Sequence, residues 1–156
     1  EQRKNITIVG LRYFNVFGPR EHYKGKSASM IFQLRSQIRA GKAPRLFKFG
    51  EQVRDHIYVK DVVAATIKAL ESKKSGIYNI GTGKGSTFNE VLAAVQETLG
   101  TNKQVEYFDN PITDVYQVNT LADTPLAKSE LGWKSEFTLK NAVKDYFHWL
   151  SEQEKK

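Results

Sequence analysis

Three polar residues stand next to strand and turn signals, where their side chains could bind and transform a phosphorylated ligand. Asn15 follows the apolar run 6–13 and precedes the turn Gly18-Pro19, so its amide lies at a strand end, where open α/β folds bind ligands. Arg54 lies among strand-like residues, and its planar fork of donors suits a pyrophosphate. Lys24 sits in a basic loop, where nearby cations and partial desolvation could free its amine to act as a general base.

Each of the three also has a purely structural explanation. Asn15 is a common turn residue, Arg54 could be the ion-pair partner of Asp55, and Lys24 could belong to a solvated basic loop. The acids Asp55 and Asp61 we interpret as structural, one ending a strand and the other capping a helix.

The elements that must position these residues alternate between short apolar runs and segments of helical periodicity, which indicates an α/β fold. We expect strands over residues 6–13, 45–49, 53–59, 76–80, 104–108 and 116–119. We expect helices over residues 29–39, 61–70, 87–99, 124–131 and 138–150. Their predicted starts are the caps Asp61 and Thr138, the Thr87/Glu90 capping box and Pro125 at the first helical position. Their predicted stops are Gly41, Gly100 and Gly132.

The glycine-rich turn Gly81-Thr82-Gly83-Lys84-Gly85 follows a strand and opens a helix. A dinucleotide-binding loop needs the spacing G-x-G-x-x-G and an acidic residue at the end of a second strand about 20 residues later. Neither is present, so we reject that function for the turn and expect its glycines to serve close packing.

The composition sets wider limits. A length of 156 residues with 40% hydrophobic residues fits a single unit over 1–156. The absence of cysteine excludes disulfides and thiolate zinc sites, and three scattered histidines predict no metal site. No apolar run is long enough for a membrane span or a signal peptide, so we expect a cytoplasmic protein without a membrane partner.

A net charge of +7 could indicate a nucleic-acid partner, but the 24 basic residues are mixed with 17 acids, and no zinc-finger or RRM pattern accompanies them. We therefore predict no nucleic acid, and expect a solvated surface or a site for a phosphorylated small molecule.

The string Leu11–Arg20 (LRYFNVFGPR) resembles a signature of the extended short-chain dehydrogenase/reductase family, whose members rework nucleotide-activated sugars. The segment 46–62, with its Arg54-Asp55 pair, is similar to a second family motif, and the resemblance extends over nearly the whole chain. It implies the last core strands of a Rossmann-type enzyme plus a small α/β substrate-binding domain. The family's glycine-rich loop and Tyr-x-x-x-Lys pair are not in this sequence, so we interpret the chain as a carboxy-terminal portion whose partner is an absent amino-terminal dinucleotide-binding half.

The resemblance also implies roles for individual residues. Asn15 would bind the substrate's phosphates, Val16 would lie beside the nicotinamide, Phe47 would lie near the adenine and Arg54 would grip the diphosphate. The substrate-binding set that it implies is Asn15, Lys26, Gln33, Phe47, Lys48, Gly50, Arg54 and Tyr116.

The run RYFNVFGPRE followed by Lys24-Gly25 is similar to one branch of the family, the ADP-glyceromanno-heptose 6-epimerases, which use NADP. The alignment makes Lys24 a second acid/base on the sugar face opposite the usual tyrosine, and a neighbour of the cofactor. An epimerase needs such a pair because hydride returns to the other face of a planar carbonyl. Lys26 and Gln33 replace a serine and a histidine of that branch. Without the alignment, Gln33 could be an exposed helix residue and Tyr116 a half-buried strand aromatic.

The resemblance therefore predicts a nucleotide-sugar epimerase, acting on ADP-heptose by transient oxidation and re-reduction with bound NADP, or with NAD. It further implies a homo-oligomer, with this chain alone inactive. Two alternatives remain open at this point: another 4-epimerase or a dehydratase of the same family, and a non-catalytic binding domain.

Overall fold

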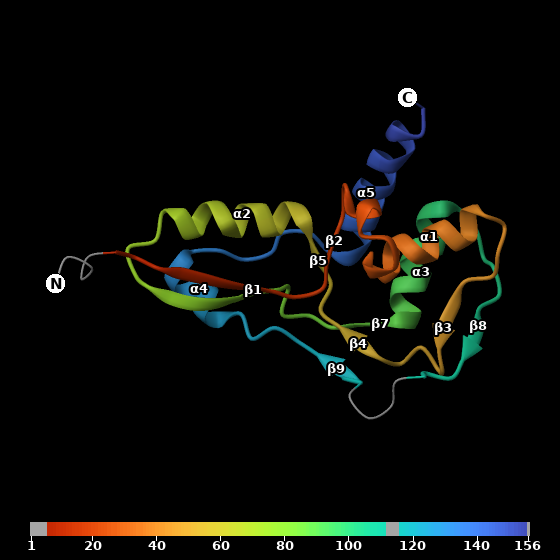
Figure 1. Cartoon of the computed structure of the whole chain (residues 1–156), viewed down its shortest axis with the longest axis horizontal. Coiled ribbons are helices and arrows are strands. Elements are labelled where there is room, and N and C mark those ends of the chain that lie inside the picture. The colour runs from red at the N-terminus through yellow and green to blue at the C-terminus, as the bar shows by residue number, and fades with distance from the viewer. Residues whose placement is uncertain (1–5, 112–115, 156) are drawn as a thin grey trace.

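A computed structural model describes residues 6–111 and 116–155 of the chain. The molecule is elongated, with the amino-terminal strand at one end and a group of helices at the other (Figure 1). Within the described residues, no helix combines the length and the apolar character that crossing a membrane requires.

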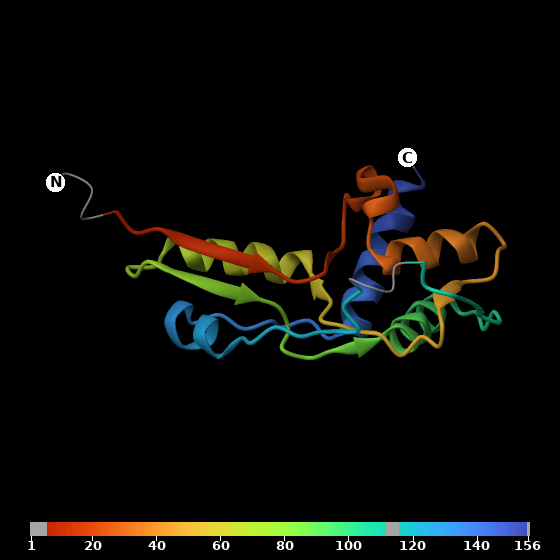
Figure 2. The same cartoon turned by 60° about the horizontal axis from the view of Figure 1, so that its bottom comes forward.

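One end of the molecule is built on a two-stranded parallel sheet. Strands β1 (Val9–Tyr13) and β6 (Gly76–Ile80) pair with Val9 opposite Gly76. Helices α2 (Val59–Leu70) and α4 (Pro125–Leu131) flank this sheet (Figures 1 and 2). The buried apolar side chains here are Ile57, Val62, Ala65, Tyr78, Ile80, Ala127, Leu131 and Trp133.

The other end holds three packed helices, α1 (Met30–Arg39), α3 (Phe88–Leu99) and α5 (Leu139–Gln153). Strands β3 (Arg45–Phe47) and β8 (Glu106–Phe108) form a parallel pair beside them (Figure 1). The helices share a second apolar core, whose fully buried members include Ile31, Leu34, Leu46, Val91, Val95, Val143 and Tyr146.

Short strands connect the two ends. Strand β2 (Val16–Phe17) pairs with β5 (Ile57–Tyr58), while β4 (Val53–Arg54) lies between β7 (Ser86–Thr87) and β9 (Asn119–Thr120). The single strand expected over 53–59 is therefore wrong. The segment divides into β4 and β5 because each pairs with a different partner strand.

Most helix ends follow the local rules expected from the sequence. The Ser29 hydroxyl accepts from Phe32 N at 3.2 Å, and Thr87 and Glu90 form the expected capping box at the start of α3. Gly100 and Gly132 end their helices in the left-handed conformation that favours glycine. These four positions confirm the predicted boundaries.

Asp61 does not cap α2, contrary to our expectation. The helix begins after Tyr58, and the buried Asp61 lies in its first turn. Its two carboxylate oxygens accept from Glu136 N at 3.0 Å and Phe137 N at 3.2 Å. Burial raises the pKa of Asp61, partly offset by these two bonds. The carboxylate thus binds a distant loop, which the local sequence does not indicate.

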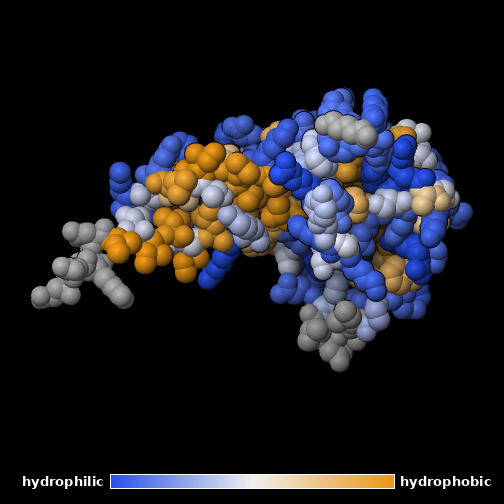
Figure 3. Space-filling view, turned by 45° about the horizontal axis from the view of Figure 1, so that its top comes forward, coloured by the Kyte–Doolittle hydropathy of each residue, from blue (hydrophilic) through white to orange (hydrophobic). Residues whose placement is uncertain are grey.

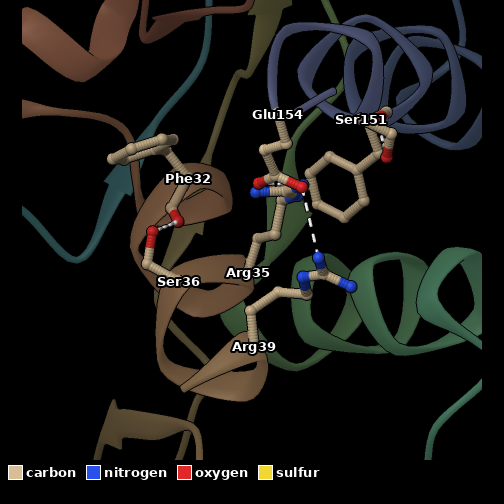
Figure 4. Close-up of polar contacts among 7 residues, drawn as sticks. Phe32, Arg35, Ser36, Arg39, Ser151 and Glu154 are labelled. Carbon is tan, nitrogen blue, oxygen red and sulfur yellow. Dashed lines mark hydrogen bonds and ion pairs between the residues drawn. The ribbon is translucent and has the colours of Figure 1, made fainter. Parts of the chain in front are cut away.

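The carboxy-terminal end of α5 is attached to α1 by charge. The Arg35 side chain is 6% exposed and donates to Glu154 Oε1 at 2.9 Å, and Arg39 reaches Glu154 Oε2 at 3.2 Å (Figure 4). The Arg35 guanidinium also lies 5.5 Å from the Phe147 ring centre.

Large apolar side chains gather on the surface of the end that carries β1 and α2 (Figure 3). This apolar face comprises Ile6, Ile8, Tyr13, Val63, Ile67, Leu70 and Ile77, all at least 49% exposed. A contiguous exposed apolar surface of this kind commonly marks an interface.

Candidate functional site

Arg54, at the end of β4, is held by neighbours of two kinds. Its Nη1 donates to the carbonyl oxygens of Val53 at 2.8 Å and Val118 at 3.3 Å. Its guanidinium carbon lies 5.0 Å from the ring centre of Tyr116 and 5.8 Å from that of Phe88. Both ring distances are within the range of cation–π attraction. The side chain is therefore fixed before any ligand binds.

The alternative explanation of Arg54 as an ion-pair partner of Asp55 is wrong. The fully buried Asp55 carboxylate accepts from Thr82 N at 2.8 Å, Thr82 Oγ1 at 2.6 Å, Gly83 N at 2.9 Å and Ala122 N at 3.2 Å. In the described parts of the chain, no carboxylate pairs with Arg54. Asp55 is structural, as expected, and it anchors the glycine-rich turn.

Two further residues of the implied substrate-binding set lie with Arg54. Phe47, at the end of β3, packs edge-on against Tyr116 with ring centres 5.6 Å apart, and contacts Phe108 at 4.9 Å. Burial raises the pKa of Tyr116, while the Arg54 charge lowers it. Phe47, Arg54 and Tyr116 thus form one cluster of two half-buried rings and a guanidinium.

Asn15 lies between β1 and β2 and contacts Asp55, the residue that follows Arg54. Its Nδ2 donates to the Asp55 carbonyl at 3.1 Å, and Ile57 N donates to the Asn15 carbonyl at 3.3 Å. The side chain remains exposed, so its amide oxygen is accessible to a ligand beside β4.

Lys24 and Val16 share a separate small cavity of about 160 Å³, whose apolar wall includes Phe17 and Val59. Lys24 lies in the 3-10 helix Glu21–Ser27. In the part of the chain that the structure describes, its ammonium is exposed and has no ion-pair partner. The partial desolvation expected for a general base is therefore not supplied by these residues.

The remaining residues of the implied set lie in different surroundings. Gln33 Nε2 donates to the carbonyls of Ala28 at 2.7 Å and Lys26 at 3.3 Å, so its amide stabilises the loop that holds Lys26. Lys48 forms an ion pair with Asp109 at 2.9 Å. Gly50 is buried with φ +74°, and a Cβ there would overlap the side chain of Asn89.

The sequence of this chain also matches a known family. Residues 1–81, just over half of the chain, match the model of the NAD dependent epimerase/dehydratase family. The chain belongs to this family. The assignment made from the RYFNVFGP and Arg54-Asp55 motifs is confirmed.

Solved structures of family members share the fold. The chain is 39% identical to ADP-L-glycero-D-manno-heptose-6-epimerase of Helicobacter pylori, with a TM-score of 0.85 over 93% of this chain and 45% of that one. It is 31% identical to UDP-glucose 4-epimerase of Thermotoga maritima, solved with UDP-glucose, with a TM-score of 0.87 over 97% and 48%. It is 30% identical to UDP-N-acetylglucosamine 4-epimerase of Methanobrevibacter ruminantium, with a TM-score of 0.87 over 97% and 48%. The chain thus spans about half the length of these relatives.

Glu21 organises the loop that carries Lys24, and the sequence analysis did not identify it. Glu21 is 3% exposed, and its carboxylate accepts from Gly18 N at 3.2 Å, Ser29 N at 2.7 Å and the Ser29 hydroxyl at 2.9 Å. These bonds join the turn after β2 to the start of α1. Nothing in the local sequence distinguishes Glu21 from a solvated acid of a charged loop.

Proposed function

We propose that this chain is the substrate-binding portion of a nucleotide-sugar epimerase, and that the sugar nucleotide is ADP-glyceromanno-heptose. The cluster of Phe47, Arg54 and Tyr116 carries the proposal because it joins a diphosphate-binding group to aromatic surface. The 39% identity to an ADP-heptose epimerase supports the choice of sugar.

The cluster suits a nucleoside diphosphate in a specific way. Carbonyl oxygens occupy Nη1 of Arg54, while Nη2 and Nε have no partner in the described residues and can donate to phosphate oxygens. The half-buried Phe47 ring offers a surface for the base. Asn15, the last residue of the β1–β2 connection, would bind the phosphates from the other side.

The cavity of Val16 and Lys24 fits the nicotinamide end of an NADP or NAD cofactor. Its apolar wall can contact a flat ring, and the free Lys24 ammonium can donate to a ribose hydroxyl or an amide. When bound, such a cofactor would take up hydride from the sugar carbon and give it back. The chain's own contribution would be to orient the ring against Val16 and to keep the ring's rear face away from water.

Lys24 would hold and move the proton at its Nζ. An epimerase needs a proton donor and acceptor on each face of the carbonyl, and Lys24 would serve the face opposite the tyrosine expected elsewhere in the protein. In this chain Lys24 is exposed, so the desolvation that activates it would come from the rest of the protein.

The apolar face on β1 and α2 (Figure 3) would receive that remaining part. The solved relatives are about twice as long as this chain, and one edge of β1 has no partner strand within the described residues. A neighbouring strand and its covering elements would pair with that edge and bury the exposed side chains.

A 4-epimerase of a UDP-sugar is the second candidate, favoured by the likeness to the UDP-glucose 4-epimerase. The variant Lys24→Met separates the two in the full-length protein. Our proposal predicts a fall in kcat of about 100-fold or more with little change in KM, the scale of general acid–base catalysis. The exposed Lys42 outside the site provides the control, Lys42→Met. Full turnover of the Lys24 variant would favour the 4-epimerase.

A further inference from the structure

The connection between β3 and β4, residues 48–52, joins two groups of the proposed nucleotide site. Phe47 ends β3 and Arg54 ends β4, and their side chains would bind the base and the diphosphate of one nucleotide. Because the connection is short, its conformation sets the separation and the orientation of these two groups. A residue that fixes the connection therefore influences both ends of the ligand.

The first turn of α3 holds this connection by hydrogen bonds. Asn89 Nδ2 donates to the Phe49 carbonyl at 2.9 Å, and Asn89 N donates to the Gly50 carbonyl at 3.0 Å. The preceding residue of the helix, Phe88, donates its N–H to the Gln52 carbonyl at 3.1 Å. Asn89 thus binds the middle of the connection with both its main chain and its side chain.

The Asn89 amide is itself held in place from the other side. The Tyr107 hydroxyl, on β8, donates to Asn89 Oδ1 at 2.9 Å. The amide oxygen therefore accepts from β8 while the amide nitrogen donates to the connection, so the group cannot be inverted without losing both bonds. The buried Gly50 lies so close that a Cβ there would overlap the Asn89 side chain. The side chain thus joins three elements in one orientation.

Other hydrogen bonds of the connection are internal to it. Gly50 N donates to the Phe47 carbonyl at 2.7 Å, and Gln52 Nε2 donates to the Lys48 carbonyl at 2.8 Å. Because donor and acceptor both lie within residues 47–52, these bonds give the segment its shape without placing it against the rest of the protein. The placement against α3 and β8 depends on the bonds of Asn89.

We propose that Asn89 is a positioning residue that sets the separation of Phe47 and Arg54, and so couples recognition of the base to recognition of the diphosphate. The role rests on the function proposed above, because it takes a nucleoside diphosphate as the ligand of those two side chains. Once one end of the nucleotide is bound, a preorganised site binds the other end at high effective concentration. A loosened connection loses that gain, while each end still binds its own group.

Calorimetry of the full-length protein with ADP and with inorganic pyrophosphate tests this role. Asn89→Ala removes both side-chain bonds, adds no charge and favours the helix. We expect it to bind ADP about tenfold more weakly and pyrophosphate as tightly as before. Tyr107→Phe, which frees only the amide oxygen, should weaken ADP binding by about threefold. The double variant should bind ADP no more weakly than Asn89→Ala, because both changes act through one contact. A merely structural role would lower the unfolding temperature without changing the ratio of the two affinities.

The matched control is Asn141→Ala, the same change at an exposed position in the first turn of α5, which should leave both affinities unchanged. Equal losses for ADP and pyrophosphate in Asn89→Ala would overturn the proposal, as would no loss for either. Arg54→Lys separates the role of Asn89 from the function on which it rests. If Arg54→Lys weakens ADP binding and Asn89→Ala does not, only the role of Asn89 fails. If the unchanged protein does not bind ADP, the proposed nucleotide site fails with it.

Discussion

Arg54 carries the proposed recognition of the diphosphate because two carbonyls and two rings fix its guanidinium. A lysine cannot reproduce the planar fork. We expect Arg54→Lys in the full-length protein to weaken ADP binding by roughly 10- to 100-fold, about 1.4 to 2.7 kcal/mol, with a smaller effect on AMP. Calorimetry with both nucleotides measures this. Arg45→Lys is the control, as the exposed Arg45 side chain contacts Glu106 and Phe108 at the surface. Equal losses for ADP and AMP would contradict the assignment of Arg54 to the diphosphate.

His56 makes stability depend on pH in a predictable direction. An unfolded histidine titrates near pH 6.5, whereas burial lowers the pKa of His56 to about 4. Between these values the unfolded chain binds a proton that the folded chain excludes. The contribution of the neutral His56 ring to the free energy of unfolding is therefore fully present above pH 6.5. It is lost as the pH drops towards 4, by about 2 kcal/mol at pH 5 and about 3 kcal/mol in all.

Urea unfolding at pH 7 and pH 5 checks this effect. The variant His56→Phe should lose about 2 kcal/mol less stability between the two pH values than the unchanged protein. His148→Gln is the control, because His148 is exposed and forms an ion pair with Glu152 at the surface. If His56→Phe loses as much stability on acidification as the control, the imidazole is not the group responsible.

At this scale, the motifs indicated residues that lie together, but not the residues that support them, and the binding roles stay predictions. Phe47, Arg54 and Tyr116 lie in contact with one another. The partners of Asp61 and Glu21 could not be found in the sequence, because Asp61 binds residues 75 and 76 positions away and Glu21 joins two elements across a loop.

At the scale of elements, Asp55 holds the glycine-rich turn between β6 and β7. Its carboxylate accepts four hydrogen bonds. In an asparagine, the NH₂ group would replace one of the two acceptor oxygens and would face N–H groups that need an acceptor. We expect Asp55→Asn to reduce the free energy of unfolding by about 2 to 4 kcal/mol, measured by urea titration. Asp123→Asn changes an exposed acid nearby and should cost little. A difference of less than about 0.5 kcal/mol between the two variants would show that the turn does not depend on Asp55.

The attachment of α5 to α1 gives a second prediction (Figure 4). Glu154→Ala leaves the buried Arg35 charge without its partner, so we expect a loss of about 1 to 3 kcal/mol of stability. The exposed Arg39 pair adds little. Glu152→Ala, which removes only an exposed partner of His148, is the matched control. Thermal unfolding of both variants measures the difference, and equal melting temperatures would mean that Arg35 finds other partners.

The starts of α1, α3 and α5 were predicted well because their caps are local. Ser29, Thr87 and Thr138 each satisfy an N–H group three residues ahead, so the signal lies within one turn. The two-residue strands were predicted poorly because their existence depends on distant partners. Strand β4 pairs with both β7 and β9, and no window of sequence around Val53 contains that information.

At the scale of the whole molecule, the proposed function requires a further part of the protein beside the apolar face on β1 and α2 and beside Lys24. We expect the 156-residue chain alone to show no turnover with any nucleotide sugar, since its sequence lacks the Tyr-x-x-x-Lys pair of the family. The apolar face should make it self-associate, which light scattering can measure. Leu70→Lys, at an 83% exposed position of that face, should reduce the association. Turnover by the isolated chain would contradict this account.

The central claim is tested most directly by incubating the full-length protein with ADP-heptose, and separately with UDP-glucose, and determining the stereochemistry of each product by NMR. The account predicts inversion at the exocyclic carbon of ADP-heptose and no change in UDP-glucose. Epimerisation of UDP-glucose with ADP-heptose left unchanged would contradict it.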